Sequence, residues 1–195
     1  LADILIDHSV RLKAGETLLV ECFDLPDSTL PRLLVQKAAG RGGIALVETR
    51  DARIVRELVL RGSAEAIEKW GRIDRARMDQ VQAYIGLRGA WNISEMSDVP
   101  SERLDAYNAL YQKPVHFERR VTKTKWCVLR MPNASMAQQA GMSTGAFEDF
   151  YFDVCTLDYA QMAKDQAPLV ARMEAAREVR ISGPETDLTF SIAGI

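Results

Sequence analysis

The sequence predicts an α/β fold with an open, doubly wound and mostly parallel sheet flanked by helices. Strand-sized apolar runs alternate with amphipathic helical segments over roughly the first 130 residues, which favours parallel β-α units. Glycine, proline or polar residues bound each run. The chain of 195 residues is long enough for one well-buried domain, or for one domain and the first piece of another.

The first half of the chain predicts three strands. The run at 17–23 is continuously apolar, which is typical of a strand covered on both faces. Two further strands are expected at 44–48 and 83–87. Helices are expected from Leu1 to Leu12, from the capping residues Asp27 or Ser28 to Gly40, around Ile54 and Leu58 up to Gly62, and from the cap Ser63 to Met78.

The middle of the chain predicts a helix and a fourth strand. The helix opens at Pro100 and is expected to break or kink at Pro114, because proline lacks an amide hydrogen and its ring clashes with the preceding turn. The basic run from Arg119 to Lys125 is expected to be a solvated linker, since no stacking aromatics interleave it. A buried strand from Trp126 to Met131 follows.

The last third predicts helices and a hairpin. A short helix at 134–140 precedes an aromatic-faced helix around Phe147, whose stripe is expected to join the core. Asp158 caps a final helix, which is expected to bend at Pro168. Strand-like segments at 178–182 and 187–192 then flank a Gly-Pro turn, which indicates a hairpin.

The switch to an antiparallel hairpin suggests where one domain gives way to another. Residues 1–177 are therefore predicted to form an amino-terminal α/β domain, and residues 178–195 the start of a second, truncated domain. The chain begins at Leu1 without a methionine and stops at Ile195 just after a strand-like segment, so both ends are expected to be cut points.

Composition excludes several classes of function. The net charge of −2 is nearly balanced and no basic face is visible, so nucleic acid is not an expected partner. The apolar runs are far shorter than the ~20 residues that span a bilayer, so no membrane association is expected. Cys22, Cys127 and Cys155 form no paired spacing, which favours free thiols in a reducing cytoplasm.

A literal match to the nucleophile elbow of α/β-hydrolases occurs at 141–145, with Ser143 at its centre. That chemistry needs the serine on a turn directly between strand and helix, with an acid and then a histidine following it in the chain. A helical segment intervenes here, and both histidines, His8 and His116, precede Ser143. Ser143 is therefore interpreted as a helix cap.

The loop after the 83–87 strand is better placed for binding. It leaves the carboxyl end of a predicted strand, and this is the edge where open α/β sheets bind ligands. Arg88 and Asn92 lie in this loop and are the candidate binding residues, since they could meet a carboxylate or a peptide backbone. Glycine is common in any loop that follows a strand. The alternative is therefore that this loop only connects the strand to the next helix and binds nothing.

The inventory of metal ligands is small. A two-metal centre needs several carboxylate and imidazole ligands converging on a pair of ions. The sequence has only two histidines, and no ligand spacing surrounds either His8 or His116. Glu148, Asp149 and Asp153 share one helix at exposed spacing and are expected to be solvated. We predict no catalytic and no metal-binding residue within this chain.

Four segments together resemble one known family. They are Lys-Ala-Gly-Glu-Thr-Leu-Leu-Val at 13–20, Lys-Trp followed by Pro at 125–132 with Ala-Gly-Met-Ser at 140–143, the Phe-bearing helix with Cys and Leu-Asp at 147–158, and Thr-Asp-Leu at 186–188. In these segments the chain resembles the amino-terminal domain of the aminopeptidase T and aminopeptidase S metalloaminopeptidases, of thermophilic metalloprotease type. The specific part of the resemblance is 125–158.

The resemblance implies a function that this chain would not perform alone. Members of that family are cytoplasmic, usually homodimeric exopeptidases that use two divalent metal ions, such as zinc, cobalt or magnesium, to release amino-terminal residues from peptides. Their metal ligands lie in the second domain, beyond residue 195. The chain is therefore expected to be inactive by itself, with a peptide substrate and two ions belonging to the full-length protein.

Two other functions remain open. The first is a non-catalytic α/β binding module that uses the loop around Arg88 and Asn92. The second is a self-contained serine hydrolase, which predicts labelling of Ser143 by an organophosphonate; we expect no labelling. The sequence does not specify the preferred amino-terminal residue, the native metal or the dimer face.

Overall fold

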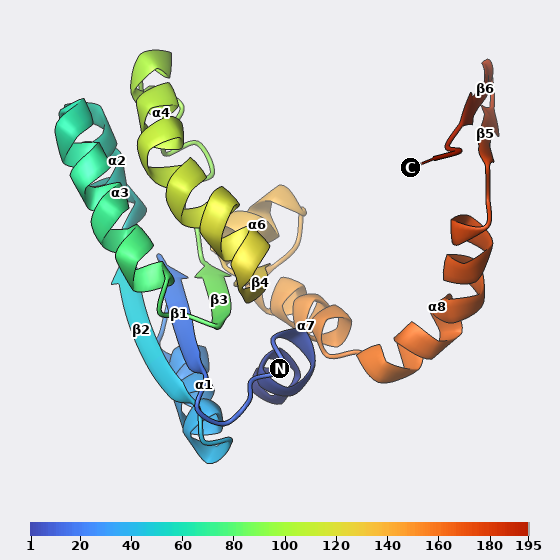
Figure 1. Ribbon diagram of the computed structural model, residues 1–195, viewed down its shortest axis with the longest axis horizontal. Coiled ribbons are helices and arrows are strands. Elements are labelled where there is room, and N and C mark those ends of the chain that lie inside the picture. The colour runs from blue at the N-terminus through green and yellow to red at the C-terminus, as the bar shows by residue number, and fades with distance from the viewer. Residues whose placement is uncertain (195) are drawn as a thin grey trace. The chain divides into compact units, whose positions relative to one another are not determined.

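The computed structural model describes residues 1–194 (Figure 1). The chain forms two compact units, Leu1–Thr156 and Leu157–Ile195. The division predicted at 177/178 remains a prediction. It concerns where a second domain begins, whereas the two units are defined only by which residues contact one another. No helix described for residues 1–194 has both the length and the apolar character needed to cross a membrane.

The first unit contains a parallel sheet of four strands in the order β2-β1-β3-β4. The strands are β1 (Thr17–Phe23), β2 (Ile44–Arg50), β3 (Ala83–Arg88) and β4 (Lys125–Arg130). All three strand pairs are parallel, and β1 lies between β2 and β3. The predicted α/β class with a mostly parallel sheet is therefore confirmed.

Helical segments precede, connect and follow the strands of this sheet. They are η1 (Ile4–Ser9), α1 (Thr29–Gly40), α2 (Ala52–Arg61), α3 (Ala64–Met78), α4 (Ser101–Tyr107), η2 (Asn108–Arg120), α5 (Val121–Lys123), α6 (Ala134–Gln139) and α7 (Thr144–Cys155), where η marks π-helical hydrogen bonding. Two of the predicted caps form as expected: Ser63 accepts a hydrogen bond from the Ala66 amide, and Ser143 accepts one from the Ala146 amide.

Two apolar clusters cover opposite faces of the sheet, which is why the arrangement is doubly wound. On one face, Leu18 and Val20 of β1 pack with Leu5 of η1 and Leu34 of α1. On the other face, the alternate residues of β1 and β3 pack with α2, α3, α4 and η2. Strand β1 is buried along its length because both faces are covered, as its continuous apolar run predicts.

The expected break at Pro114 is wrong. Residues Ser101 to Lys123 are helical without interruption, and Pro114 lies inside η2. In an α-helix the proline ring clashes with the carbonyl four residues earlier, whereas π-helical bonding pairs each amide with the carbonyl five residues earlier. Arg75 of α3 also donates a hydrogen bond to the Pro114 carbonyl at 2.8 Å, and α3 runs beside the long helix that contains it (Figure 1).

The basic run is not the solvated linker that its composition predicts. Arg119 and Arg120 form the last turn of η2, and Lys123 belongs to α5. Arg119 donates to the Asp79 carboxylate at 2.6 Å, and the Arg120 guanidinium lies 4.7 Å from the centre of the Trp126 ring. Specific partners, namely the Asp79 carboxylate for Arg119 and the Trp126 ring for Arg120, therefore hold these arginines against the fold.

Two predicted core segments are more exposed than expected. Strand β4 is an edge strand, so the side chains of Trp126 and Val128 remain about 43% and 40% exposed on one face. The aromatic stripe of α7 is buried only at Phe147, while Phe150 is exposed. Sheet position, which the local pattern does not encode, decides how far an apolar residue is covered.

The second unit contains α8 (Tyr159–Glu174) and a two-stranded antiparallel sheet formed by β5 (Glu178–Gly183) and β6 (Thr186–Ser191). Asp158 caps α8 by accepting from the Gln161 amide at 2.9 Å, as predicted. The hairpin is also confirmed, and its turn places Glu185 at a positive φ of 55°.

Candidate functional site

The site lies where the topology predicts ligand binding. In the order β2-β1-β3-β4 the chain moves from β1 to β2 on one side and to β3 on the other, so the connections diverge between β1 and β3. In open α/β sheets, ligands bind outside the carboxyl ends of the strands at such a point. Phe23 and Arg88 are the register partners that end β1 and β3 here.

A cavity of about 330 Å³ opens at this point, on the face covered by α2 and η2. Arg88, His116 and Arg120 supply its basic wall, and we call it the arginine cavity. The lining also includes apolar and aromatic side chains, among them Phe23, Val55, Met96, Tyr107 and Tyr111. Gln112 and the carboxylate of Glu21, which is paired with Arg88, also line it. The cavity thus combines cationic groups, one paired carboxylate and an apolar wall.

Beneath the cavity lies a set of ionised side chains between the sheet and the helices α3 and η2. We call it the buried charge layer; its members are Glu21, Glu48, Arg50, Asp74, Arg77, Arg88 and Arg120. Buried charges are tolerated only where partners replace the water that they lose. The contacts within this layer therefore determine its energetics.

Glu21 is the centre of the layer, although it sits in the middle of the apolar strand β1. Its side chain is only 2% exposed, and its Oε2 accepts from Arg88 Nη2 at 2.7 Å and from the Tyr84 hydroxyl. Burial raises the pKa of this carboxyl, but the charges of Arg88 and Arg50 outweigh that effect and hold the pKa below its ordinary value. Glu21 is therefore ionised at neutral pH.

Gly86 leaves room for the contacts that Tyr84 and Arg88 make with Glu21. It is the register partner of Glu21 on β3, and it lies between Tyr84 and Arg88, whose side chains both extend toward Glu21. A Cβ at Gly86 would lie 3.1 Å from Tyr84 Cε1 and 3.2 Å from Arg88 Nη2. A side chain at this position would crowd both donors.

Arg50 connects the edge strand to the helices. Its guanidinium contacts Glu21 Oε1 at 3.2 Å, Glu48 Oε1 at 2.9 Å and Asp74 Oδ2 at 2.6 Å, and its side chain is 7% exposed. Tyr111 of η2 donates to the same Asp74 oxygen and accepts from Arg50 Nη1, both at 2.6 Å. Burial and the adjacent Asp74 carboxylate raise the pKa of the Tyr111 phenol.

His116 and Arg120 form the wall of the arginine cavity that η2 provides. Arg120 Nε donates to His116 Nδ1 at 3.2 Å, which requires an imidazole that carries no proton on Nδ1. Burial lowers the pKa of His116 to about 4, an effect that the charge of Glu21 only partly offsets, so the ring is neutral at pH 7. Its remaining proton is then on Nε2.

The two predicted binding residues do not line the same cavity. Arg88 lines the arginine cavity and is held by Glu21 and Tyr84, with its guanidinium 4.4 Å from the centre of the Phe23 ring. Asn92 is exposed; its amide accepts from the Ser94 backbone at 3.0 Å, and it lines a smaller cavity of about 210 Å³. A joint binding role for Arg88 and Asn92 remains a prediction.

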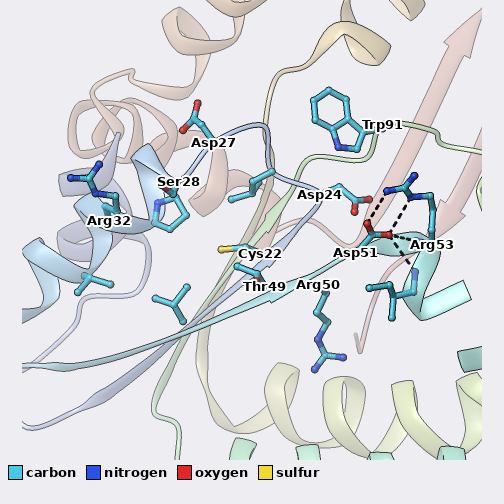
Figure 2. A pocket seen from close by; sticks show the side chains of 15 residues that line it. Cys22, Asp24, Asp27, Ser28, Arg32, Thr49, Arg50, Asp51, Arg53 and Trp91 are labelled. Carbon is cyan, nitrogen blue, oxygen red and sulfur yellow. Dashed lines mark hydrogen bonds and ion pairs between the residues drawn. The ribbon is translucent and has the colours of Figure 1, made fainter. Parts of the chain in front are cut away.

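A larger cavity of about 650 Å³ lies on the opposite face, at the ends of β1 and β2. Figure 2 shows Cys22 and Thr49 in its floor, Trp91 above them, and Asp51 bonded to Arg53 at one side. Figure 2 also shows Arg50 pointing away from this cavity, toward the helices of the other face. Burial raises the pKa of the Cys22 thiol to about 11, so it is not an activated nucleophile.

The residues described here do not fit a two-metal centre. Among residues 1–194, no group of three or more histidine, cysteine, aspartate or glutamate side chains is arranged to hold an ion. His8 belongs to η1 on one face of the sheet, whereas His116 packs near Tyr84 on the other face. The two imidazoles therefore cannot share an ion.

The remaining candidates from the sequence are Ser143, three carboxylates of α7 and the cysteines. Ser143 caps α7 and is separated from β4 by α6, so it lacks the strand-turn-helix geometry of a nucleophile elbow. Glu148, Asp149 and Asp153 are exposed on α7, as expected. All three cysteines are free, and Cys22 is buried.

Sequence reasoning missed the buried charge layer. It assigned His116 no carboxylate neighbour, although Glu21 influences its pKa. The one local signal was Glu21 itself, an ionisable residue in the middle of an otherwise apolar strand. Such a residue requires a cationic partner, but the pattern does not say that the partners are Arg50 and Arg88.

Comparison with known proteins finds a family model and a solved structure that each match nearly the whole chain. A family model described as thermophilic metalloprotease (M29) matches residues 1–194. The structure of wild-type AmpT from Thermus thermophilus is similar with a TM-score of 0.72 at 18% identity, covering 98% of this chain and 52% of that chain. The chain thus spans about half the length of AmpT, and at this identity the likeness shows the fold alone.

Two reductases are much less similar. A putative NADPH:quinone reductase from Bacillus thuringiensis has a TM-score of 0.32 at 14% identity, covering 77% of this chain and 46% of its own. An NADH-dependent reductase, A1-R′, complexed with NAD, has a TM-score of 0.29 at 12% identity, covering 72% and 70%. Neither supports a functional argument. No curated protein matches the chain.

Proposed function

The chain belongs to the thermophilic metalloprotease (M29) family, and from this membership we propose that it is the amino-terminal domain of a metal-dependent aminopeptidase. The observation that carries the proposal is the family match over residues 1–194. The similarity to the fold of AmpT is consistent with it. In this proposal the full-length protein releases amino-terminal residues from peptides.

We place the two-metal site in polypeptide beyond this chain. The support is that the side chains of residues 1–194 offer no converging set of three or more ligands, while the chain covers 52% of AmpT. The ions would be zinc, cobalt or magnesium. Because no residue described here fits the ions, we derive no step of the hydrolysis from this chain. Its own contribution would be to the walls of the substrate chamber and to a homodimer contact in the cytoplasm.

The alternative is a non-catalytic binding module. One observation favours it: the arginine cavity lies at the carboxyl ends of β1 and β3, where an open α/β sheet binds ligands without needing a second domain. The same domain could serve both roles in a longer protein, so the experiment must test catalysis directly.

The test compares two proteins from the same gene. The product of the full reading frame and the chain 1–195 are each treated with a chelator and assayed on a panel of aminoacyl and peptide substrates with zinc, cobalt or magnesium. We expect metal-dependent release of the first residue by the longer protein only. Metal-dependent turnover by the 195-residue chain would show that the ligands lie within it. No turnover by the longer protein would reject the aminopeptidase.

The same preparations test the remaining parts of the proposal. Sedimentation equilibrium of the longer protein is expected to give the mass of a homodimer, and a monomeric mass would reject this part. The substrate and metal panels identify the preferred amino-terminal residue and the native ion.

A further inference from the structure

The charges of the buried charge layer do not balance. Its cations are Arg50, Arg77, Arg88 and Arg120, and its anions are Glu21, Glu48 and Asp74. His116 adds no charge at neutral pH, because it accepts a hydrogen bond from Arg120 through Nδ1. One positive charge is left without a carboxylate partner.

That charge belongs to Arg120. No carboxylate of residues 1–194 lies within ion-pair distance of its guanidinium, whereas Arg50, Arg77 and Arg88 each contact at least one. Its Nε donates to the neutral His116 ring at 3.2 Å, and its guanidinium lies over the rings of Tyr84 and Trp126, with centroids at 5.0 and 4.7 Å. Arg120 Nη1 is buried and has no hydrogen-bond partner among the described residues. Arg120 as a whole is partly exposed, but a buried guanidinium nitrogen without an acceptor is costly, and an anion beside it relieves that cost.

The space for such an anion is present. Arg120, His116 and Arg88 line the same cavity of about 330 Å³, which is within the size range of small-molecule sites. His116 Nε2 carries a proton and has no protein acceptor in the described part of the chain, so it supplies a second donor. The cavity also occupies the switch point between β1 and β3, where this topology binds ligands.

We propose that the arginine cavity binds the carboxylate of a small molecule with an apolar or aromatic body, with Arg120 as its ion-pair partner and the His116 Nε2–H as a further donor. A single carboxylate balances the single uncompensated charge. A phosphate would bring about −1.5 to −2 charges and leave an excess of negative charge. Val55, Met96 and Tyr107 provide the apolar contact for the body. The inference does not depend on the peptidase assignment.

The experiment is isothermal titration of the 195-residue chain at pH 7 with a matched pair of probes. N-acetyl-L-phenylalanine carries a carboxylate and an aromatic body, and its amide has the same shape without the charge. We expect the acid to bind and the amide to bind at least tenfold more weakly. Equal binding of the two, or binding of inorganic phosphate without binding of the acid, would overturn the proposal.

Two variants locate the site. Arg120→Met removes the unpaired charge while keeping the length of the side chain, so we expect a folded protein whose affinity for the acid falls at least tenfold. Arg119→Met is the matched control, because Arg119 is its neighbour in η2 but binds Asp79 and does not line the cavity. We expect its affinity to stay within twofold of the unmodified chain.

A third variant covers the case in which Arg120→Met does not fold. Arg120→Lys keeps the positive charge but loses the planar guanidinium, so it should still prefer the acid over the amide while binding it more weakly. Melting curves with and without the acid should show stabilisation of the unmodified chain and of Arg119→Met. Unchanged affinity in both Arg120 variants, or an equal loss in Arg119→Met, would show that the acid binds elsewhere.

Discussion

Arg50 Nη2 lies 2.6 Å from Asp74 Oδ2, and this ion pair joins the edge strand β2 to helix α3 across one face of the sheet. An edge strand has a hydrogen-bonded neighbour on only one side, here β1, so side-chain contacts add to a single backbone ladder. Tyr111 of η2 contacts both members of the pair. Three elements that are distant in the sequence thus meet at one carboxylate.

We predict that Asp74→Asn lowers the free energy of unfolding by about 1.5–3 kcal/mol, because a buried charge-assisted hydrogen bond is replaced by a neutral one. The side chain of Asp74 is only 8% exposed, so water does not compensate. The control is Asp187→Asn, which breaks the solvent-exposed pair with Arg180 and should lower the free energy of unfolding far less than Asp74→Asn does. Urea unfolding measures both, and similar losses in the two variants would contradict the prediction.

The stability of the first unit should fall as the pH is lowered from 6.5 toward 4. Burial holds the folded-state pKa of His116 at about 4, below its ordinary value of 6.5; Glu21 opposes this shift, while Arg120, Arg88 and Arg50 add to it. The unfolded state therefore binds more protons in this window, and folding must expel them. The loss across the whole window is about 3 kcal/mol.

His116→Asn tests this assignment, because asparagine offers Arg120 an acceptor but does not titrate. Unfolding is best compared between pH 6.5 and about 5, above the range in which Glu21 and Asp74, whose pKa values are lowered, begin to be protonated. We expect the variant to lose most of the slope. Parallel curves for the two proteins would assign the slope to other groups.

Gly71 should not tolerate even a methyl group. A Cβ at this position of α3 would lie 2.2 Å from the carbonyl oxygen of Leu110, which is four residues before Pro114 in η2. We expect Gly71→Ala to destabilise the protein by about 1–3 kcal/mol, despite the better helix propensity of alanine. Gly145→Ala in α7 is the control: nothing lies within 4 Å of its Cβ, and it should be neutral or stabilising by up to about 1 kcal/mol.

Cys22 should resist alkylation in the folded protein. Burial raises its pKa to about 11, an effect only partly offset by the charge of Arg88, so almost no thiolate exists at pH 8. Iodoacetamide followed by peptide mass spectrometry should find Cys22 unmodified before denaturation and modified after it. Rapid labelling of Cys22 in the native protein would mean that the cavity of Figure 2 exposes the thiol.

The strands and helices could be predicted because their signals are local. The run from Thr17 to Phe23 is apolar in sequence and covered on both faces in space, and the caps Ser63 and Ser143 bond as their spacing predicts. Pro114 misled the prediction because its consequence depends on a partner helix. The Leu110 carbonyl, four residues before Pro114, packs against Gly71 of α3. The residue that makes room for this part of the helix is therefore in α3 and not near the proline in the sequence.

The candidate site could be predicted only in part. The topology rule pointed to the carboxyl end of β3 and to Arg88, and the structure places Arg88 in the wall of the arginine cavity, while its binding role stays a prediction. The rule did not predict that the side chains near this edge would include Arg50, Asp74, Tyr111 and His116. Strand register and helix packing bring these residues together, and neither can be deduced from the local sequence pattern. A sequence pattern describes neighbours along the chain, whereas electrostatic partners are neighbours across the sheet.

The position of Glu21 limits how this domain can be re-engineered. Exchanging it for a hydrophobic residue of similar volume would leave the Arg88 guanidinium and the Tyr84 phenol without their carboxylate and would remove one of the three carboxylates around Arg50. A single-site library at this position should therefore return few well-folded substitutes. A more stable version would need Glu21, Arg50 and Arg88 replaced together by residues chosen as one packed group. Directed evolution by single substitutions would have to pass through destabilised intermediates to reach that version.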